Sequence, residues 1–510
     1  MYYNLGLKFE KIAADNPEAI CLKYLDEHHF TYRELDNRSN QLAKWMLTQG
    51  VQKGDVIGIL NNKSFMGFSL MLACLKTGII YTNLDPFSPL SRLVKITDRC
   101  SPVLIFSDFA KDQLADEIVQ AFDEKMRWLN EEAVMNGVGK EDTHLPVETE
   151  AICGTDAAYI MFTSGSTGFP KGAVMTHANI LSFLQWSISI TKPEAGDVFT
   201  NVNPIYFDNS VFDFYTSIFS GVALAPLTHE VTKSPRDLVN AVDKLACTIW
   251  FSVPSLLVYL LTTRMLNKEC MKHFRLFVFG GEGFPKPKLK ELYDLYGHRA
   301  RLLNVYGPTE CTCICSEYFI GPKDFEDMTH LAPLGKMTKN FFYQIVDADM
   351  NPTHKGELLL GGPNVGSGYY NDLDRTAAAF IQNPLQSNYR DIMYRTGDLV
   401  ERDDKGLVHF KGRADNQIKH MGYRIELEEI ESAINTISGV KEAAVIYKKQ
   451  AAGLGQIVGF VATDLPLEGK ELVSKVRSIV PDYMVPKKIE VRTELPKNQN
   501  GKIDRNSLKG

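Results

Sequence analysis

Short apolar runs alternate with amphipathic stretches through most of this chain. Three uninterrupted apolar runs, Val56–Leu60, Val103–Phe106 and Leu276–Phe279, have the length and composition of buried strands. A stretch with helical spacing, Phe65–Leu75, separates the first two runs. This strand–helix–strand order predicts mainly parallel sheets covered by helices on both faces. The glycine-containing segment Gly356–Gly368 departs from the order and predicts an antiparallel section.

The pattern changes near Asp403–Asp415, where the boundary between two domains is expected. Two helices are expected there, at Leu427–Ile437 and Leu472–Val480, and two strands, at Ala443–Tyr447 and Ile457–Thr463. These elements would form a compact α+β unit that is separate from the preceding α/β region.

At 510 residues, the chain is too long for one hydrophobic core. We expect an α/β protein with a large N-terminal domain (residues 1–414), made of mainly parallel sheets and a small β-rich section. A small α+β C-terminal domain (residues 415–510) would follow. The longest apolar run, Ile249–Leu261, is broken by Pro254 and is too short to span a bilayer. With no signal peptide at the start of the sequence, a cytoplasmic protein without membrane contact is expected.

Charge is unevenly distributed between the two expected domains. The net charge is −6, but residues 416–510 contain 15 Lys and Arg against 12 Asp and Glu, a balance of +3 that leaves −9 for the remainder. Such a balance excludes a strongly basic nucleic-acid binder. The C-terminal part could meet an acidic partner, or its charges could form an ordinary solvated surface.

Cysteines follow no disulfide or zinc spacing, although three of the nine, Cys311, Cys313 and Cys315, alternate along the chain. Alternation would put them on one face of a strand. Metal sites more often use pairs separated by two to four residues, so small buried strand residues are the favoured interpretation.

A loop with the composition of a phosphate site follows the apolar run Tyr159–Phe162. It spans Thr163–Gly172 and contains hydroxyl residues, glycines and a single lysine. Glycines let backbone N–H groups approach an anion, hydroxyls add donors, and Lys171 adds charge, which suits a polyphosphate. Because Pro170 and Gly172 flank the lysine, Lys171 is expected on a turn. The spacing differs from the common nucleotidase phosphate loop, and a flexible surface loop is the alternative.

The loop Thr163–Gly172 resembles the phosphate-binding signature of the adenylate-forming superfamily. That superfamily includes acyl-CoA synthetases, luciferases and the adenylation domains of nonribosomal peptide synthesis. Further motifs similar to those of the peptide-synthetase branch recur in order over about residues 20–505. They are Phe30–Leu35, Leu75–Gly78 with Leu84–Pro86, Asn304–Glu310, Gly356–Leu358, Tyr394–Leu399, Gly412–Asp415 with Gln417–Lys419 and Gly422–Glu426, and Asn500–Asp504.

The resemblance implies that ATP and a carboxylate form an acyl-adenylate, which then passes to a thiol. Joining two anions needs cationic and N–H stabilisation of the transition state. By resemblance, Thr309 would bind the α-phosphate, and Glu310 would hold Mg²⁺, a hard cation with oxygen ligands. The other nucleotide-binding residues implied are Thr163, Ser164, Gly165, Ser166, Thr167, Gly168, Lys171, Gly281, Glu282, Asn304, Tyr306, Gly307, Asp398 and Arg413.

Asp398 is expected to hold the ribose. A carboxylate has two acceptor oxygens, and a vicinal diol offers two donors. The resemblance adds Arg413 as its partner and Tyr306 as a ring that stacks on adenine. Without the surrounding motif, Asp398 would be a turn residue after Gly397.

The resemblance also assigns roles to the C-terminal domain, which would rotate over the active site about a hinge at Asp415. Lys502 would be the catalytic lysine of adenylation, acting only while its domain is docked. Lys419 would lie on the loop that enters the site for thioester formation, together with Gly422 and Arg424. In isolation, a lysine such as Lys502 beside Gly501 in a polar tail is a solvated surface group.

Asp208 indicates the substrate class. In amino-acid-activating relatives an aspartate at this position binds the α-ammonium, whereas acyl and aryl acid activators generally lack it. A buried carboxylate is costly unless paired, so Asp208 favours a cationic substrate group, and a helix N-cap is the alternative. The remaining pocket is mainly apolar and fits a small or branched aliphatic amino acid. Its residues, by resemblance, are Asn209, Phe212, Phe251, Val278, Gly280, Val305, Cys313 and Ile314.

Several activities remain compatible with these motifs. The main hypothesis is an amino-acid-adenylating enzyme that loads the phosphopantetheine thiol of a carrier protein. A stand-alone D-alanine–carrier protein ligase is an alternative, since Phe207–Tyr215 resembles the equivalent stretch, although those enzymes tend to carry Cys where this chain has Gly280. An acyl- or aryl-CoA ligase is a second alternative, and an ATP-binding pseudoenzyme a third. An excised synthetase domain would have the same sequence features as a stand-alone enzyme.

Overall fold

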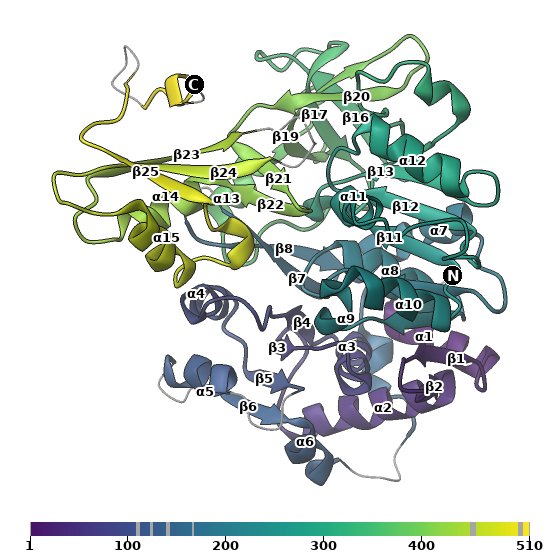
Figure 1. Cartoon of the computed structure of the whole chain (residues 1–510). Helices are drawn as coiled ribbons and strands as arrows, with labels where there is room; N and C mark the ends of the chain where they lie inside the picture. Colours follow the sequence, from purple (N-terminus) through teal and green to yellow (C-terminus); the bar gives the residue numbers. More distant parts are fainter. Residues whose placement is uncertain are drawn as a thin grey trace.

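The computed structural model describes residues 2–108, 113–122, 126–138, 143–165, 168–448, 455–497 and 503–508. Two large sheets and a five-stranded sheet make up the part before residue 414, and a small α+β unit follows (Figure 1). In Figure 1 this small unit, in yellow and light green, lies beside α4 and faces the edge of the sheet that contains β7 and β8.

The larger sheet has nine strands, most of them parallel. Its central strands β9 to β13 and β1 pair in parallel, and β2, β14 and β15 add antiparallel edges. In sheet order the strands are β15 (Lys336–Met337), β14 (Ser316–Phe319), β13 (Arg301–Tyr306), β12 (Leu276–Gly280), β11 (Ile249–Ser252), β9 (Val198–Asn201), β10 (Ala223–Pro226), β1 (Ile20–Lys23) and β2 (His29–Thr31).

A second sheet of six strands is also mainly parallel. In sheet order its strands are β6 (Arg127–Asn130), β5 (Leu104–Ser107), β3 (Val56–Leu60), β4 (Ile80–Asn83), β7 (Ala157–Thr163) and β8 (Lys171–Thr176). Only β7 and β8 run antiparallel, and their last register pair joins Thr163 to Lys171. This pairing closes the glycine-rich loop between the two strands and fixes both of its ends.

Helices separate the two sheets and cover their outer faces. In β3, Ile57 and Ile59 belong to the core between the sheets, whereas Val56 and Leu60 belong to the outer core, as strand alternation requires. The helices of the central core are α1 (Leu5–Asp15), α2 (Tyr32–Thr48), α3 (Phe65–Thr77), α7 (His177–Thr191) and α8 (Asn209–Ile218). The outer helices are α4 (Leu90–Cys100) and α5 (Gln113–Gln120) on the six-stranded sheet, and α10 (Pro235–Lys244), α11 (Pro254–Thr262) and α12 (Lys286–Tyr296) on the nine-stranded sheet.

A five-stranded antiparallel sheet and the small unit complete the fold. The sheet is formed by β16 (Phe342–Val346), β17 (Lys355–Gly361), β18 (Phe380–Gln382), β19 (Ile392–Arg402) and β20 (Val408–Arg413). The small unit contains the hairpin β21 (Gln417–His420) and β22 (Tyr423–Glu426), the sheet β23 (Glu442–Lys448), β24 (Gln456–Ala462) and β25 (Lys488–Arg492), and the helices α14 (Leu427–Asn435), α15 (Gly469–Arg477) and α16 (Arg505–Leu508). Three further short helices are α6 (Glu131–Gly137), α9 (His229–Lys233) and α13 (Leu373–Ala379), and single 3₁₀ turns lie at Val147–Ala151, Thr309–Cys311, Pro322–Phe325 and Asp482–Met484.

The predicted fold class is confirmed, and two local predictions are wrong. Lys171 does not lie on a turn but begins β8, because its backbone pairs with Thr163 on the neighbouring strand. The three alternating cysteines do not share a strand: Cys311 ends a 3₁₀ turn, Cys313 has a left-handed backbone, and Cys315 precedes β14. All three are buried, as expected of small core residues.

Candidate active site

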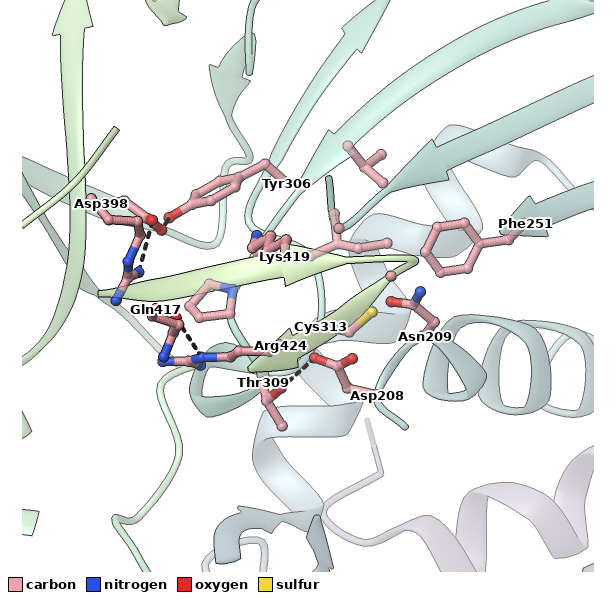
Figure 2. Close-up of a pocket in the computed structure, with 17 residues that line it drawn as sticks. Asp208, Asn209, Phe251, Tyr306, Thr309, Cys313, Asp398, Gln417, Lys419 and Arg424 are labelled. Atoms are coloured by element: carbon pink, nitrogen blue, oxygen red, sulfur yellow. Dashed lines mark hydrogen bonds and ion pairs between the residues drawn. The ribbon is translucent and has the colours of Figure 1, made fainter. Parts of the chain in front are cut away.

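A cavity lies where β11 and the segments after β9, β12 and β13 meet the hairpin β21–β22 (Figure 2). The large domain supplies one wall, including Asp208 and Tyr306, and the hairpin supplies Lys419 and Arg424. Carboxyl ends of parallel strands are the usual place for ligands in such sheets. The fold therefore brings together residues that are distant along the chain.

Asp208 lies at one end of this cavity, immediately before α8. Its side chain makes no helix-capping bond; instead it accepts a hydrogen bond of 2.6 Å from the hydroxyl of Thr309 (Figure 2). Burial raises the pKa of the Asp208 carboxyl, and the Thr309 hydrogen bond offsets this only in part. The N-cap alternative is thus wrong. Within the described residues this carboxylate forms no ion pair, although Lys419 and Arg424 line the same cavity and oppose the rise of its pKa.

Both apolar and polar side chains line the cavity that contains Asp208. Six of the nine residues predicted for the substrate pocket line it, and three lie behind its wall. Phe212 is fully buried and packs edge-on against Phe251, with ring centroids 5.0 Å apart. The residues that line the cavity are Asp208, Asn209, Phe251, Val305, Cys313 and Ile314, whereas Phe212, Val278 and Gly280 do not line it.

A tight turn carries the chain from Tyr306 to Cys315 around this end of the cavity. The backbone N–H of Cys315 donates to the carbonyl of Tyr306 at 2.7 Å, which folds the segment back on itself. A Cβ at Gly307 would lie only 2.2 Å from the carbonyl oxygen of Cys313, so this position requires glycine. Thr309, Glu310 and Cys313 are held at the cavity by this turn.

The middle of the cavity contains the predicted ribose and adenine residues. Tyr306 donates its hydroxyl hydrogen bond to Asp398, and Arg413 binds the other oxygen of Asp398 at 2.8 Å (Figure 2). Asp398 lies inside β19 and is 3% exposed, so it is not a turn residue. The ammonium of Lys419 lies 5.3 Å from the centre of the Tyr306 ring. The carboxylate of Asp398 and the phenol of Tyr306 therefore lie close to two cations, Arg413 and Lys419.

Gly281, Glu282 and Asn304 line an adjoining cavity of about 540 Å³ that shares Tyr306 and Lys419 with the first. Glu282 accepts hydrogen bonds from the backbone N–H groups of Ser255 at 2.7 Å and Gly422 at 3.2 Å. Since Gly422 belongs to the hairpin, Glu282 ties the small domain to the large one.

The described residues of the predicted phosphate loop do not line this cavity: they are Thr163, Ser164, Gly165, Gly168 and Lys171. Ser164 donates to the carbonyl of Arg424, which does line it. Two residues predicted for the same loop, Ser166 and Thr167, lie outside the described residues. Glu310 is fully buried here and accepts from Tyr369 at 2.7 Å and from Arg424 at 2.6 Å, with Lys171 at 3.7 Å. Burial alone would raise the pKa of Glu310, but Arg424 and Lys171 outweigh it and hold the pKa well below its ordinary value.

The hairpin β21–β22 reaches into the site because its turn is sharp. Gly422 has φ of +83°, and a Cβ there would lie 2.4 Å from the side chain of Val253. The next residue, Tyr423, stacks on Tyr483 with ring centroids 3.8 Å apart, and Phe207 packs edge-on against Tyr423. Lys419 is thereby held at the cavity, as predicted for the loop that enters the site.

Lys502, the predicted catalytic lysine, lies outside the described residues. Its described neighbour Ile503 packs on a cluster of the small domain that contains Val458 and Phe460. Asp415, the predicted hinge, binds the guanidinium of Arg413 through both carboxylate oxygens, at 2.9 and 2.5 Å.

Four residues at the site were missed by sequence reasoning. Tyr369 binds Glu310, and Glu426 lies 3.8 Å from Lys171. Glu429 accepts from the backbone N–H of Gly165 at 3.1 Å and pairs with Arg92 of α4. Glu426 and Glu429 both lie in the acidic run at the start of α14. This run was the feature of the sequence that could have indicated them.

These features agree with the comparisons with known proteins. The AMP-binding enzyme family matches residues 9–370, and the AMP-binding enzyme C-terminal domain matches residues 429–502. The chain belongs to the AMP-binding enzyme family. Its predicted membership of the adenylate-forming superfamily is thereby confirmed.

Two kinds of relative match almost the whole chain. A D-alanine–D-alanyl carrier protein ligase from Lacticaseibacillus rhamnosus is 30% identical and covers 100% of this chain and 99% of its own length. Gramicidin S synthase 2 from Brevibacillus brevis is 32% identical over 98% of this chain, which spans only 11% of that synthase. The chain therefore corresponds to one whole ligase or to one part of a much longer protein.

Solved structures share the fold at lower identity. An artificially fused adenylation–PCP di-domain, NpsA-ThdA from Klebsiella oxytoca, has a TM-score of 0.82 at 21% identity and covers 96% of this chain and 93% of its own. The o-succinylbenzoate CoA synthetase MenE from Bacillus subtilis has a TM-score of 0.85 at 22% identity, over 100% of this chain and 98% of its own. Within the described residues, no helix is both long and apolar enough to cross a membrane.

Proposed function

We propose that this protein activates an amino acid with ATP and passes the aminoacyl group to the phosphopantetheine thiol of a carrier protein. It is an adenylating ligase, as its family membership shows. The observation that carries the choice of an amino acid is Asp208, a partly buried carboxylate that lines the cavity and forms no ion pair within the described residues. A substrate ammonium would supply the missing charge.

The apolar end of the cavity selects the substrate side chain. Phe251, Val305 and Ile314 offer only van der Waals contact, so a small or branched aliphatic side chain fits them. Asn209 adds one amide at the edge of this pocket. We propose that Asp208 orients the amino acid and that the apolar residues select the size of its side chain.

The nucleotide would occupy the rest of the cavity. Asp398 offers acceptors to the ribose hydroxyls, Tyr306 offers a ring face to adenine, and Thr309 lies next to Asp208, where the α-phosphate would meet the substrate carboxylate. Among the described residues no group of three or more His, Cys, Asp or Glu side chains could hold a metal alone. Mg²⁺ typically takes one or two carboxylates plus phosphate oxygens, so the buried Glu310 fits as its protein ligand. When bound, the ion would neutralise phosphate charge.

The small domain would serve the two steps in turn. Lys502 would approach the substrate carboxylate and α-phosphate during adenylation, and Lys419 would lie at the site during transfer to the thiol. The orientation described here has Lys419 at the cavity, which suits the second step. We keep the domain boundary between residues 414 and 415, with Asp415 as the hinge, and we place the reaction in the cytoplasm, where ATP is available.

A D-alanine–carrier protein ligase is the second candidate. It is favoured by the L. rhamnosus relative, whose whole length this chain matches. Gly280 weighs against it, because such ligases tend to carry cysteine at this position. A Cβ at Gly280 would lie 2.4 Å from the carbonyl oxygen of Val305, so a cysteine would not fit this backbone. An acyl- or aryl-CoA ligase is disfavoured because its substrate would leave Asp208 unpaired.

An ATP–pyrophosphate exchange assay with a panel of amino acids tests the proposal. We expect exchange with valine, isoleucine or another small aliphatic amino acid, and D-alanine in the same panel decides between the two candidates. Thioester formation on a phosphopantetheinylated carrier protein then checks the second step. Exchange with carboxylic acids that lack the amino group, but with no amino acid, would overturn the assignment.

A further inference from the structure

The amino-acid end of the cavity lies where the neighbouring strands β9 and β11 stop pairing. Within their described residues, a single register pair, Ile249 with Phe199, joins the two strands. Beyond this pair, β11 contributes Phe251 to the cavity, and the segment after β9 contributes Asp208 (Figure 2). The position of Phe251 relative to Asp208 therefore depends on contacts other than the strand ladder.

The side chain of Asn203 bridges β9 and β11 beyond their register pair. Asn203 lies two residues after β9, and its amide nitrogen donates to the carbonyl oxygen of Phe251 at 3.0 Å. The same nitrogen donates to Oδ2 of Asp213, also at 3.0 Å. Asn203 and Asp213 are both buried, at 5% and 0% exposure. Because buried backbone carbonyls are nearly always bonded, Asn203 supplies a hydrogen bond that the ladder of β9 does not.

Asp213, on α8, determines how Asn203 is oriented. An amide nitrogen carries two hydrogens, and its direction is fixed when each hydrogen has its own acceptor. Oδ2 of Asp213 also accepts from the amide of Asn201, the last residue of β9, at 3.2 Å. Burial raises the pKa of Asp213 to about 8, although the bonds from Asn203 and Asn201 act in the opposite direction. At pH 7 the carboxyl is therefore largely neutral and acts as a hydrogen-bond acceptor.

Lys63 fastens the next strand ends in a similar way. It follows β3 in the other large sheet, and its ammonium is almost fully buried. The ammonium donates to the carbonyl oxygens of Asn201 at 2.6 Å and Leu227 at 2.7 Å, which lie at the carboxyl ends of β9 and β10. Side chains thus hold the carboxyl ends of β11, β9 and β10 in place beside the cavity.

A separate pair of residues joins β9 and β11 at their amino ends. The hydroxyl of Thr248, directly before β11, donates at 2.7 Å to Oδ1 of Asp197, directly before β9. The same hydroxyl accepts from the backbone N–H of Val198 at 3.0 Å. Neither Thr248 nor Asp197 lines the cavity. These two residues therefore provide a matched comparison, because they join the same two strands at the end away from the cavity.

We propose that Asp213 and Asn203 are positioning residues that fix the width of the amino-acid pocket. Asp213 orients Asn203, and Asn203 holds Phe251 against the segment that carries Asp208. Neither positioning residue lines the cavity itself. This inference rests on the proposed function, because it concerns the pocket for the proposed substrate. It means that the accepted side-chain size depends on two residues behind the pocket wall as well as on the residues that line it.

The main test replaces the acceptor by an apolar group of similar size. Asp213→Leu leaves buried amide donors without an acceptor, which costs about 1–3 kcal/mol. The KM for the best amino acid in pyrophosphate exchange should therefore rise roughly tenfold, with the KM for ATP unchanged. The preference for that amino acid over its homologue with one more methylene should fall about threefold. Asp213→Asn keeps an acceptor oxygen and should restore both values to within about twofold of wild type.

Two further variants separate pocket positioning from a loss of general stability. Thr248→Val removes the hydroxyl that joins the amino ends of β9 and β11. It should lower the Tm but leave both the KM for the amino acid and the substrate preference unchanged. Asn203→Ala removes the bond to Phe251 from the other side. It should reproduce the effects of Asp213→Leu and serves as the test if that variant fails to fold.

Amide hydrogen exchange of the ligand-free protein checks the same inference without catalysis. Asp213→Leu should speed exchange in residues 202–208 and 251–253, because the segments beside the cavity lose their common anchor. Thr248→Val should instead speed exchange in residues 197–199 and 248–249. The two variants should thus loosen opposite ends of the same pair of strands.

Two outcomes would overturn the inference. One is an equal change of KM, substrate preference and exchange pattern in Asp213→Leu and Thr248→Val. The other is an Asp213→Asn variant that is as impaired as Asp213→Leu. A wild-type protein that activates no amino acid would contradict the proposed function instead, and hydrogen exchange would still decide whether Asp213 and Asn203 hold the two segments together.

Discussion

Two carboxylates, Asp208 in the active-site cavity and Glu310 beside it, are balanced in opposite ways. At the phosphate end, Glu310 is paired with Arg424 and Lys171, and its pKa is held well below the ordinary value. At the amino-acid end, Asp208 accepts a hydrogen bond from the Thr309 hydroxyl, and burial raises its pKa although Lys419 and Arg424 act in the opposite direction. The protein completes one end with its own groups and leaves the other for a substrate. In this orientation Asp208 is therefore open to a substrate ammonium, whereas Glu310 already has two cationic neighbours.

The largest expected effect concerns Lys502, which lies outside the described residues. Lys502→Ala should lower adenylation by about two to four orders of magnitude, the range for losing a charge contact made in the transition state. ATP binding should remain nearly intact, and transfer from a preformed adenylate should survive. Pyrophosphate exchange measures the first step and single-turnover carrier loading the second. Near-normal exchange in the variant would remove Lys502 from the mechanism.

Asp208 tests the amino-acid end directly. Removing one member of a buried ion pair costs roughly 3–5 kcal/mol, so Asp208→Ala should impair amino-acid activation by about 100-fold or more. The loss should be far smaller with the des-amino acid of the same side chain, because no unpaired charge is then buried. Pyrophosphate exchange with valine or isoleucine, against the matching branched fatty acid, gives the comparison. Equal losses on both substrates would make Asp208 structural and favour a carboxylic-acid ligase.

Tyr306 lies between the two ends and should affect only the nucleotide. Tyr306→Phe keeps the ring but removes the hydroxyl that donates to Asp398. A hydrogen bond to a charged group contributes about 1.5–3 kcal/mol, so the KM for ATP should rise about tenfold. The KM for the amino acid should stay unchanged in the same exchange assay. A rise in both constants would mean that the variant disturbs the whole cavity.

The pH dependence should be the smallest and most specific effect. Because burial raises the pKa of Asp208, this carboxyl takes up a proton before an ordinary aspartate does as the pH falls. The value of kcat/KM for the amino acid should therefore decline as the pH falls. The acidic limb of this pH profile should be absent in Asp208→Asn. Glu310 stays ionised over that range because its pKa is lowered, so it adds no limb. A limb that persists in Asp208→Asn would assign the titration to another group.

Much of the fold could be predicted from local pattern alone. The apolar run Val56–Leu60 coincides with β3, and Phe65–Leu75 falls inside α3, because buried strands and helices leave continuous apolar signals. Lys171 was misplaced because its strand is defined by pairing with β7 across the loop, and no nearby residue reveals that pairing. Motif residues such as Asp208 and Asp398 meet at the cavity as the resemblance implied.

The contacts between domains could not be predicted in the same way. Glu429 and Arg92 are 337 residues apart, and each would pass for a surface charge on an amphipathic helix. Their pairing depends on the orientation of one whole domain against another. Only the acidic start of α14 hinted at it, and that feature alone would also suit the N-terminus of any helix.

The aromatic contact between Phe207 and the hairpin has a consequence for anyone who would retarget this protein to another amino acid. Phe207 immediately precedes Asp208 and packs on Tyr423, which in turn stacks on Tyr483. Exchanging the pocket loop for that of another enzyme would therefore also exchange the surface that contacts the small domain. We expect such a chimaera to accept the new amino acid but to transfer it slowly to the carrier protein. Transplanting Tyr423 and Tyr483 together with the loop would restore the contact.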